Sequence, residues 1–303
     1  MSKVYKLLAT ICASATVFCA PAPSAHGDVT VVPGAGATIV ASSVTNGTDG
    51  VIVAILAYGS PAGTVYVYAD DPTDRIEGIV VQPQEHPPFT ASQLSINLIV
   101  QPKPDTDGQI KYLGSIIRDG DDGDLWIGQV NVQGDIGKST APHATILEAQ
   151  VVGSVTAVGS IASDIVSLGS TQASGSITRI EASNGSILGD VVLVQGLIDT
   201  VMASSASATA DIGSPSDAVY ILSKFAIKRI EAKNSIYANI DATYNGGSAS
   251  SDILYIKTTL GSLNGSVKGL SIGGAGAPNG LEVATDLNAS ISLSGAIRDP
   301  VTI

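Results

Sequence analysis

The sequence predicts an all-β protein, with a right-handed parallel β-helix (solenoid) of about seven coils after a small β-rich N-terminal part. Three observations predict this fold. A short triplet recurs about every 25 residues, and two further apolar columns keep step with it. The chain also has 33 glycines and only 4% aromatic residues. Small and β-branched side chains of this kind suit stacked, similar units better than a conventional core.

The recurring triplet is a small residue, then Ser or Asp, then Ile or Leu. Its apolar members are Ile136, Ile161, Ile187, Ile212, Ile236, Leu263 and Leu287. Successive members are 25, 26, 25, 24, 27 and 24 residues apart. Gly114-Ser115-Ile116 is a candidate eighth copy with a shorter step of 20 residues. A period of this length indicates structural repeats.

Two more columns accompany the triplet. Six or seven residues before it stand Val130, Val155, Ile180, Ala206, Ile230, Ile256 and Leu281. Four residues after it stand Ile165, Val191, Ile240, Val267 and Ile291, with Thr140 and Ser216 as exceptions. Three apolar segments per unit, separated by Gly, Ser, Asn and Asp, predict three short strands per coil with turns between them.

The N-terminal residues 1–27 are expected to form a signal peptide. Lys3 and Lys6 precede an apolar run from Leu7 to Ala20, which is too short to span a membrane. Cleavage is expected after Gly27, with cleavage after Ala25 or a retained anchor as the alternatives. Both cysteines lie within this segment, so the mature chain would have no disulfide.

Residues 28–125 contain several β-rich segments and clustered prolines, without the regular period. This part is interpreted as either a cap that covers the end of the solenoid or a set of irregular early coils. Residues 126–303 carry the repeats.

The repeats over residues 126–303 resemble the bacterial exported parallel β-helix proteins of the pectin-lyase-like architecture. The resemblance depends on repeat length and residue type, and it implies the fold without a catalytic signature. Leucine-rich repeats are the alternative, because I-x-x-I-x-A occurs at Ile177 and Ile227 and I-x-x-V-x-A at Ile198. That fold requires a longer motif that includes an asparagine, which these units lack.

The charge disfavours two classes of partner. Without residues 1–27 the chain has 13 basic and 27 acidic residues, a net charge of −14. A protein this acidic is a poor candidate for binding nucleic acid or an anionic membrane. No membrane span is expected after cleavage of the signal peptide.

The polar residues of the triplets give the most regular polar column. It consists of Asp135, Ser160, Ser186, Asp211, Ser235, Ser262 and Asp286. We expect these side chains to bond backbone N–H groups at a corner of each coil. The aspartates are three coils apart, about 14 Å at the strand spacing, so they are too far apart to share one calcium ion.

Two further groups are candidate sites. Arg229, Glu231 and Lys257, with Glu282 one coil further, are expected on one outward face, where they form either a charge-paired surface or a catalytic set. Asp119, Asp121, Asp122 and Asp124 form an acidic cluster that is the alternative calcium site, although it lacks the EF-hand spacing. No other cofactor is expected.

The sequence therefore predicts a non-catalytic, exported β-solenoid that serves as a structural or adhesion element at the cell surface or in a matrix. Its expected partners are an extracellular polysaccharide or another cell-surface protein. The mature chain has only His86 and His143, and it contains no G-x-S-x-G, H-E-x-x-H or Gly-His-Gly motif. The alternative is a calcium-assisted polysaccharide lyase or hydrolase that uses Arg229, Glu231 and Lys257.

Overall fold

The computed structural model describes most of the chain from residue 29 onward. The described residues are 29–37, 39–46, 50–58, 63–69, 75–84, 95–102, 112–118, 126–149, 151–168, 176–206, 209–246, 251–274, 280–299 and 301–303. The expected signal peptide and the four aspartates between residues 119 and 124 lie outside these residues.

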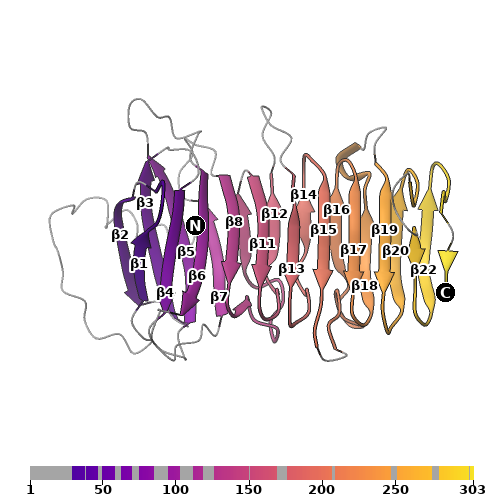
Figure 1. Cartoon of the computed structure of the whole chain (residues 1–303), viewed down its shortest axis with the longest axis horizontal. Helices are drawn as coiled ribbons and strands as arrows, with labels where there is room; N and C mark the ends of the chain where they lie inside the picture. Colours follow the sequence, from indigo (N-terminus) through magenta and orange to yellow (C-terminus); the bar gives the residue numbers. More distant parts are fainter. Residues whose placement is uncertain are drawn as a thin grey trace.

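Two long sheets extend along the length of the molecule (Figure 1). Sheet 1 contains, in spatial order, β1 (Val29–Pro33), β4 (Gly63–Ala69), β6 (Ser95–Pro102), β8 (Trp126–Val132), β11 (Val151–Ala157), β13 (Arg179–Ala182), β15 (Ile198–Ala203), β17 (Ile227–Ala232), β19 (Ile253–Thr258), β21 (Leu281–Glu282) and β23 (Val301–Thr302).

Sheet 2 contains β2 (Ile39–Asn46), β3 (Val51–Tyr58), β5 (Arg75–Gln84), β7 (Tyr112–Arg118), β10 (Ile146–Ala149), β12 (Asp164–Ser167), β14 (Val191–Leu193), β16 (Val219–Ser223), β18 (Ile236–Asp241), β20 (Leu263–Gly269) and β22 (Leu287–Leu293). A two-residue strand, β9 (Asp135–Ile136), pairs with β7, and a short 3-10 turn, η2, covers Tyr244–Gly246.

Neighbouring strands within each sheet are parallel, except where β1 pairs with β4 and β2 pairs with β3 in antiparallel fashion. From β3 onward, the strands on the main path of each sheet alternate between the two sheets along the chain. This nearly all-β arrangement of long parallel sheets is compatible with a β-solenoid. Strands β3 to β7, from the part of the sequence without a regular period, belong to the same two sheets as the repeats.

The register confirms the predicted triplet column. Ile136, Ile161, Ile187, Ile212, Ile236, Leu263 and Leu287 pair with one another in succession. The candidate eighth copy is wrong by three residues, because Leu113 pairs with Ile136 and Ile116 pairs with Leu147. The column thus continues on its N-terminal side through Leu113.

The other two columns are confirmed with local corrections, but the prediction of three strands per coil is wrong. The chain forms two sheets, and triplet residues such as Ile161, Ile187 and Ile212 pair through isolated bridges outside the strands. Val201, and not Ala206, pairs with Ile180 and Ile230, and Val201 is fully buried whereas Ala206 is exposed. In the third column the residues that pair are Leu147 and Ile221, in place of the predicted exceptions Thr140 and Ser216. The chain carries insertions at these two positions.

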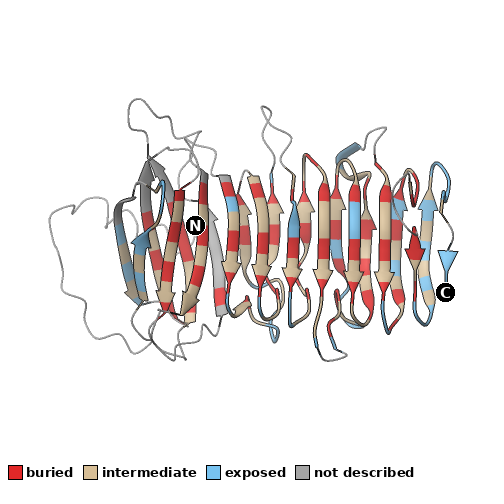
Figure 2. Cartoon of the chain, in the orientation of Figure 1, coloured by how far each residue is buried: buried red, intermediate tan, exposed pale blue. Residues whose placement is uncertain are grey.

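The space between the sheets is filled by these columns. Figure 2 shows buried positions alternating along the strands through the middle of the stack. Val130, Val155, Ile180, Val201, Ile230, Ile256 and Leu281 are all fully buried. Each inward side chain therefore stacks on its counterpart in the next strand, while the alternate side chains line the two outer faces.

Candidate functional site

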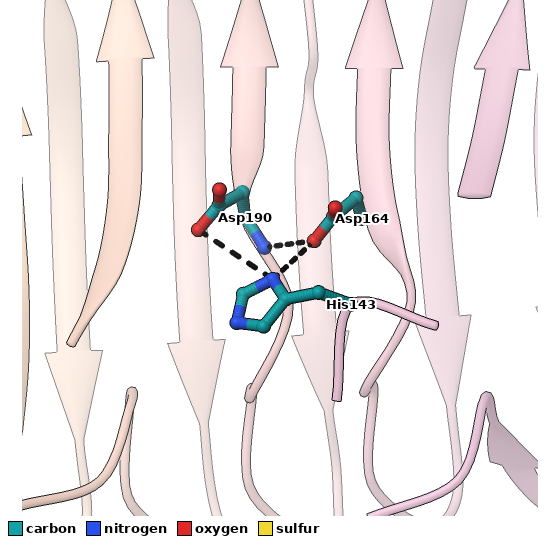
Figure 3. A group of neighbouring side chains, drawn as sticks. All are labelled: His143, Asp164 and Asp190. Carbon is teal, nitrogen blue, oxygen red and sulfur yellow. Dashed lines mark hydrogen bonds and ion pairs between the residues drawn. The ribbon is translucent and has the colours of Figure 1, made fainter. Parts of the chain in front are cut away.

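One cluster of ionisable side chains lies on the outer face of sheet 2, where His143 contacts Asp164 and Asp190 (Figure 3). Nδ1 of His143 lies 2.6 Å from Oδ1 of Asp164 and 3.9 Å from Oδ1 of Asp190. Nε2 of the same ring lies 3.4 Å from Oδ2 of Asp217. Three carboxylates thus surround one imidazole.

The two aspartates nearest to Nδ1 are brought together by strand register. Asp164 is the first residue of β12, and Asp190 directly precedes β14. Because Ile165 pairs with Val191, the residues before them are also neighbours across the strands. Residues that alternate with buried ones point outward, so both carboxylates project from the same face.

His143 and Asp217 come from the two insertions. A residue of the third column usually follows the apolar residue of the triplet by four positions, as Ile165 follows Ile161. In contrast, Leu147 follows Ile136 by eleven positions and Ile221 follows Ile212 by nine. The extra residues form the first insertion (137–145) and the second insertion (213–218). The first insertion ends just before β10 and the second just before β16. Because the order in sheet 2 is β10, β12, β14, β16, the two insertions flank the starts of β12 and β14.

Each insertion begins with a glycine in the left-handed region. Gly137 has a φ of 74° and Gly213 a φ of 73°. Each insertion then closes on itself through an antiparallel bridge, Lys138 with Ala141 and Ser214 with Asp217. The repeated geometry shows that the two insertions leave the sheet in the same way.

The His143 backbone is held in an uncommon conformation. Its φ is 64°, and its N–H donates to the carbonyl oxygen of Ala162 at 3.0 Å. A residue other than glycine is rarely found in this region, and such residues are concentrated at functional sites. This backbone directs the ring over β12 and toward the carboxylates.

Backbone donors fix the two aspartates. The N–H of Asp190 donates to Oδ1 of Asp164 at 2.9 Å, and the N–H of Tyr220 donates to Oδ1 of Asp190 at 2.8 Å. Each carboxylate is therefore oriented by the following strand of sheet 2. Within the described part of the chain, His143 is the only basic side chain that forms an ion pair with Asp164, Asp190 or Asp217.

The surroundings change two pKa values. Partial burial alone would lower the pKa of His143, but the hydrogen bond to Asp164 and the charges of the three aspartates outweigh it and raise the pKa. Burial raises the pKa of Asp190, and the charge of Asp164 adds to this effect against the hydrogen bond from Tyr220. The cluster is therefore a group of three carboxylates around one imidazole whose charge favours a cation.

The predicted alternative catalytic residues also come together, on the outer face of sheet 1. Arg229 and Glu231 lie on β17 and pair with each other at 2.8 Å, and Glu231 is the register neighbour of Lys257 on β19. Nζ of Lys257 lies 3.0 Å from Oε2 of Glu282, which also accepts a hydrogen bond from the Tyr255 hydroxyl.

The Ser/Asp column forms the backbone bonds expected of it. Oδ1 of Asp135 accepts from the N–H of Ser160, and Oγ of Ser160 accepts from the N–H of Ser186. The series continues from Ser186 to Asp211, from Asp211 to Ser235, and from Ser235 to Ser262. Each side chain thus caps the equivalent backbone group one repeat further along.

The cluster at His143 was not predicted from the sequence. His143 was named there only as one of two histidines, and no role was assigned to Asp164, Asp190 or Asp217. The available signal was the failure of Thr140 and Ser216 to fit the third apolar column, which marks the two insertions. Their approach over the intervening strands follows from the register of the stack.

Comparison with known protein families, curated proteins and solved structures found no match to this chain. Among the described residues, no helix is long and apolar enough to cross a membrane.

Proposed function

We propose that the protein is an exported right-handed parallel β-helix of about seven regular coils that serves as a non-catalytic structural or adhesion element of a cell surface or matrix. The observation that carries this proposal is the pair of continuous sheets, whose outer faces present side chains in register across neighbouring strands. Stacked strands form a rigid rod, and its long faces offer repeated contacts to an extended partner.

The outer face of sheet 2 supports a binding role. Beyond the cluster at His143 it presents polar side chains in register, with Asn264 bonded to Asn288 and Ser266 bonded to Asn239. Amide and hydroxyl groups at regular spacing suit hydrogen bonding to the hydroxyls of an extended polysaccharide. An extracellular polysaccharide is therefore the proposed partner, with another surface protein as the second candidate.

The catalytic alternative has less support. A lysine that acts as a base must lose its proton near neutral pH, which requires a lowered pKa. The hydrogen bond that Lys257 donates to Glu282 instead raises the pKa of Lys257. Burial and the bond to Glu282 likewise raise the pKa of Tyr255, and Arg229 is paired with Glu231. This arrangement stabilises the charged lysine.

Export is proposed from the residues at the N-terminus alone. Lys3, Lys6 and the apolar run to Ala20 have the pattern of a signal peptide. Expression of the full-length gene in a bacterial host should yield an extracytoplasmic protein that begins at Asp28. Edman sequencing or intact mass measurement of the exported protein checks this, and an uncleaved chain retained in the cytoplasm would contradict it.

In the deciding experiment, the exported protein is incubated with acidic and neutral polysaccharides, with and without calcium. Co-sedimentation measures binding, and unsaturated products and new reducing ends measure turnover. Saturable binding without product supports the scaffold. Calcium-dependent product that disappears in Lys257→Ala would overturn it. Lys268→Ala is the matched control, because Lys268 pairs with Asp241 on the other sheet.

A further inference from the structure

We propose that His143, Asp164 and Asp190 bind one divalent transition-metal ion, with Zn²⁺ as the expected ion. The site would fasten the first insertion to strands β12 and β14 on the outer face of sheet 2 (Figure 3). The proposal is independent of the scaffold function.

The ligand atoms have the spacing that such a site requires. Zinc lies about 2.0–2.2 Å from imidazole nitrogen and carboxylate oxygen, so the ligand atoms of a tetrahedral site are about 3.3 Å apart. The distances from Nδ1 of His143 to Oδ1 of Asp164 and Oδ1 of Asp190 are 2.6 Å and 3.9 Å. These distances bracket the required value, so binding requires a small movement of Oδ1 of Asp164 away from Nδ1 and of Oδ1 of Asp190 toward it.

The second nitrogen of the ring has the partner that metal-binding histidines commonly have. A histidine that binds a metal through one nitrogen usually donates the N–H of the other to a carboxylate or a carbonyl oxygen. Nε2 of His143 faces Oδ2 of Asp217 at 3.4 Å. Asp217 is thus a positioning residue that comes from the second insertion and is separate from the ligands at Nδ1.

The ligand carboxylates are themselves oriented by backbone N–H groups, as a metal site requires. Asp190 donates its N–H to Asp164, and Tyr220 donates its N–H to Asp190. These bonds run between neighbouring strands, so the sheet holds both carboxylates in place without a metal. The chain would therefore present a largely preformed site.

The charge of the cluster also favours a divalent ion. Asp164, Asp190 and Asp217 carry three negative charges, and His143 is their only basic partner in the described part of the chain. A protonated His143 adds a single positive charge, which leaves most of the negative charge of the three aspartates uncompensated. A divalent ion bound to neutral His143 compensates more of that charge.

The donor set distinguishes the class of metal. Imidazole nitrogen suits zinc, copper and nickel, whereas calcium requires six to eight oxygen ligands. Imidazole nitrogen and carboxylate oxygen are both ligand types that zinc takes in proteins, so this set of three suits zinc better than calcium.

The test uses the exported protein after treatment with EDTA and exchange into chelator-free buffer at neutral pH. Titration calorimetry with ZnCl₂ should show one ion per chain, and millimolar Mg²⁺ or Ca²⁺ should not displace it. His143→Gln and Asp190→Asn should each weaken binding at least tenfold. Asp217→Asn should weaken it by about 10- to 100-fold, as loss of a positioning carboxylate does.

Asp241→Asn is the matched control, because this outward aspartate of sheet 2 pairs with Lys268 and should leave zinc affinity unchanged. Circular dichroism of each variant separates a lost site from a lost fold, and Asp217 is exposed enough to be replaced without disturbing the sheets. Two results overturn the proposal: no saturable binding of zinc by the wild-type chain, or equal affinity in His143→Gln. Displacement by calcium would overturn the assignment to zinc.

Discussion

Gly213 begins the second insertion in a conformation that a side chain would not tolerate. Its φ is 73°, and a Cβ placed there would lie 2.0 Å from the carbonyl oxygen of Tyr237. Since that atom belongs to the backbone of the next strand, it cannot move away without disturbing the sheet. We expect Gly213→Ala to lower the free energy of unfolding by about 1–3 kcal/mol. Urea denaturation followed by far-ultraviolet circular dichroism measures this change.

Gly274 provides the control for this substitution. A Cβ at Gly274 would meet only the end of the Leu254 side chain, at 3.3 Å, and its φ is not in the left-handed region. Gly274→Ala should therefore change stability by less than about 0.5 kcal/mol. Equal losses for the two variants would show that the conformation of Gly213 is not the cause.

A second residue-scale prediction concerns Asp241. Burial alone would raise the pKa of this carboxyl group, but the hydrogen bonds from Thr243 and Lys268 outweigh it and lower the pKa. A carboxyl group with a lowered pKa in the folded state stabilises the protein above its unfolded pKa and loses that contribution as the pH falls through its folded pKa. Wild type should therefore be more stable than Asp241→Asn at pH 7, and the difference should shrink between about pH 4 and pH 2.

Urea denaturation of wild type and Asp241→Asn across this pH range tests the prediction. Asp286→Asn removes an exposed aspartate and controls for the general loss of negative charge. A stability difference for Asp241→Asn that stays constant from pH 7 to pH 2 would contradict the assigned interaction.

At the scale of the element, the polar column links one repeat to the next. Ser160 accepts from the N–H of Ser186 at 3.2 Å and donates its own N–H to Asp135 at 2.7 Å. Ser160→Ala removes the acceptor of Ser186 and should cost about 1 kcal/mol in the free energy of unfolding. Asp135→Asn keeps an acceptor oxygen and should cost less. A larger loss for Asp135→Asn in urea denaturation would argue against a role based on backbone bonds.

The sequence predicted the elements wherever the repeat was regular. Ile180 and Ile230 occupy the expected column because every strand of sheet 1 faces the same interior. Between them, Val201 takes the place predicted for Ala206, since the segment between β15 and the next triplet is longer than average. Spacing from the triplet alone could not locate a strand once the connecting segment changed in length.

The cluster at His143 could not be predicted in the same way. Its residues are far apart in sequence, and two of them lie in insertions that the period does not describe. Asp164 and Asp190 become neighbours through strand register, but the approach of His143 depends on its own left-handed backbone and on the bond to Ala162. The repeat period predicts the residues that every repeat shares. This site depends on two insertions that are present in only two of the repeats.

At the scale of the molecule, the stack has few contacts that connect distant strands. Each strand pairs with the two beside it, so stability is approximately a sum over repeats and their interfaces. The ends differ from the middle in burial (Figure 2). In β17 the inward residues Ile227, Ile230 and Ala232 are buried, whereas β22 contains no buried residue.

This difference predicts a gradient of local stability. Backbone amides exchange slowly where opening requires exposure of buried apolar surface and faster where little is buried. Hydrogen exchange of this chain, measured by mass spectrometry at neutral pH, should therefore be slowest in β13, β15 and β17 and faster by at least tenfold in β1 and β22, after correction for intrinsic rates. Equal protection at the middle and the ends would mean that the stack opens only as a whole, so that its repeats act as one cooperative unit.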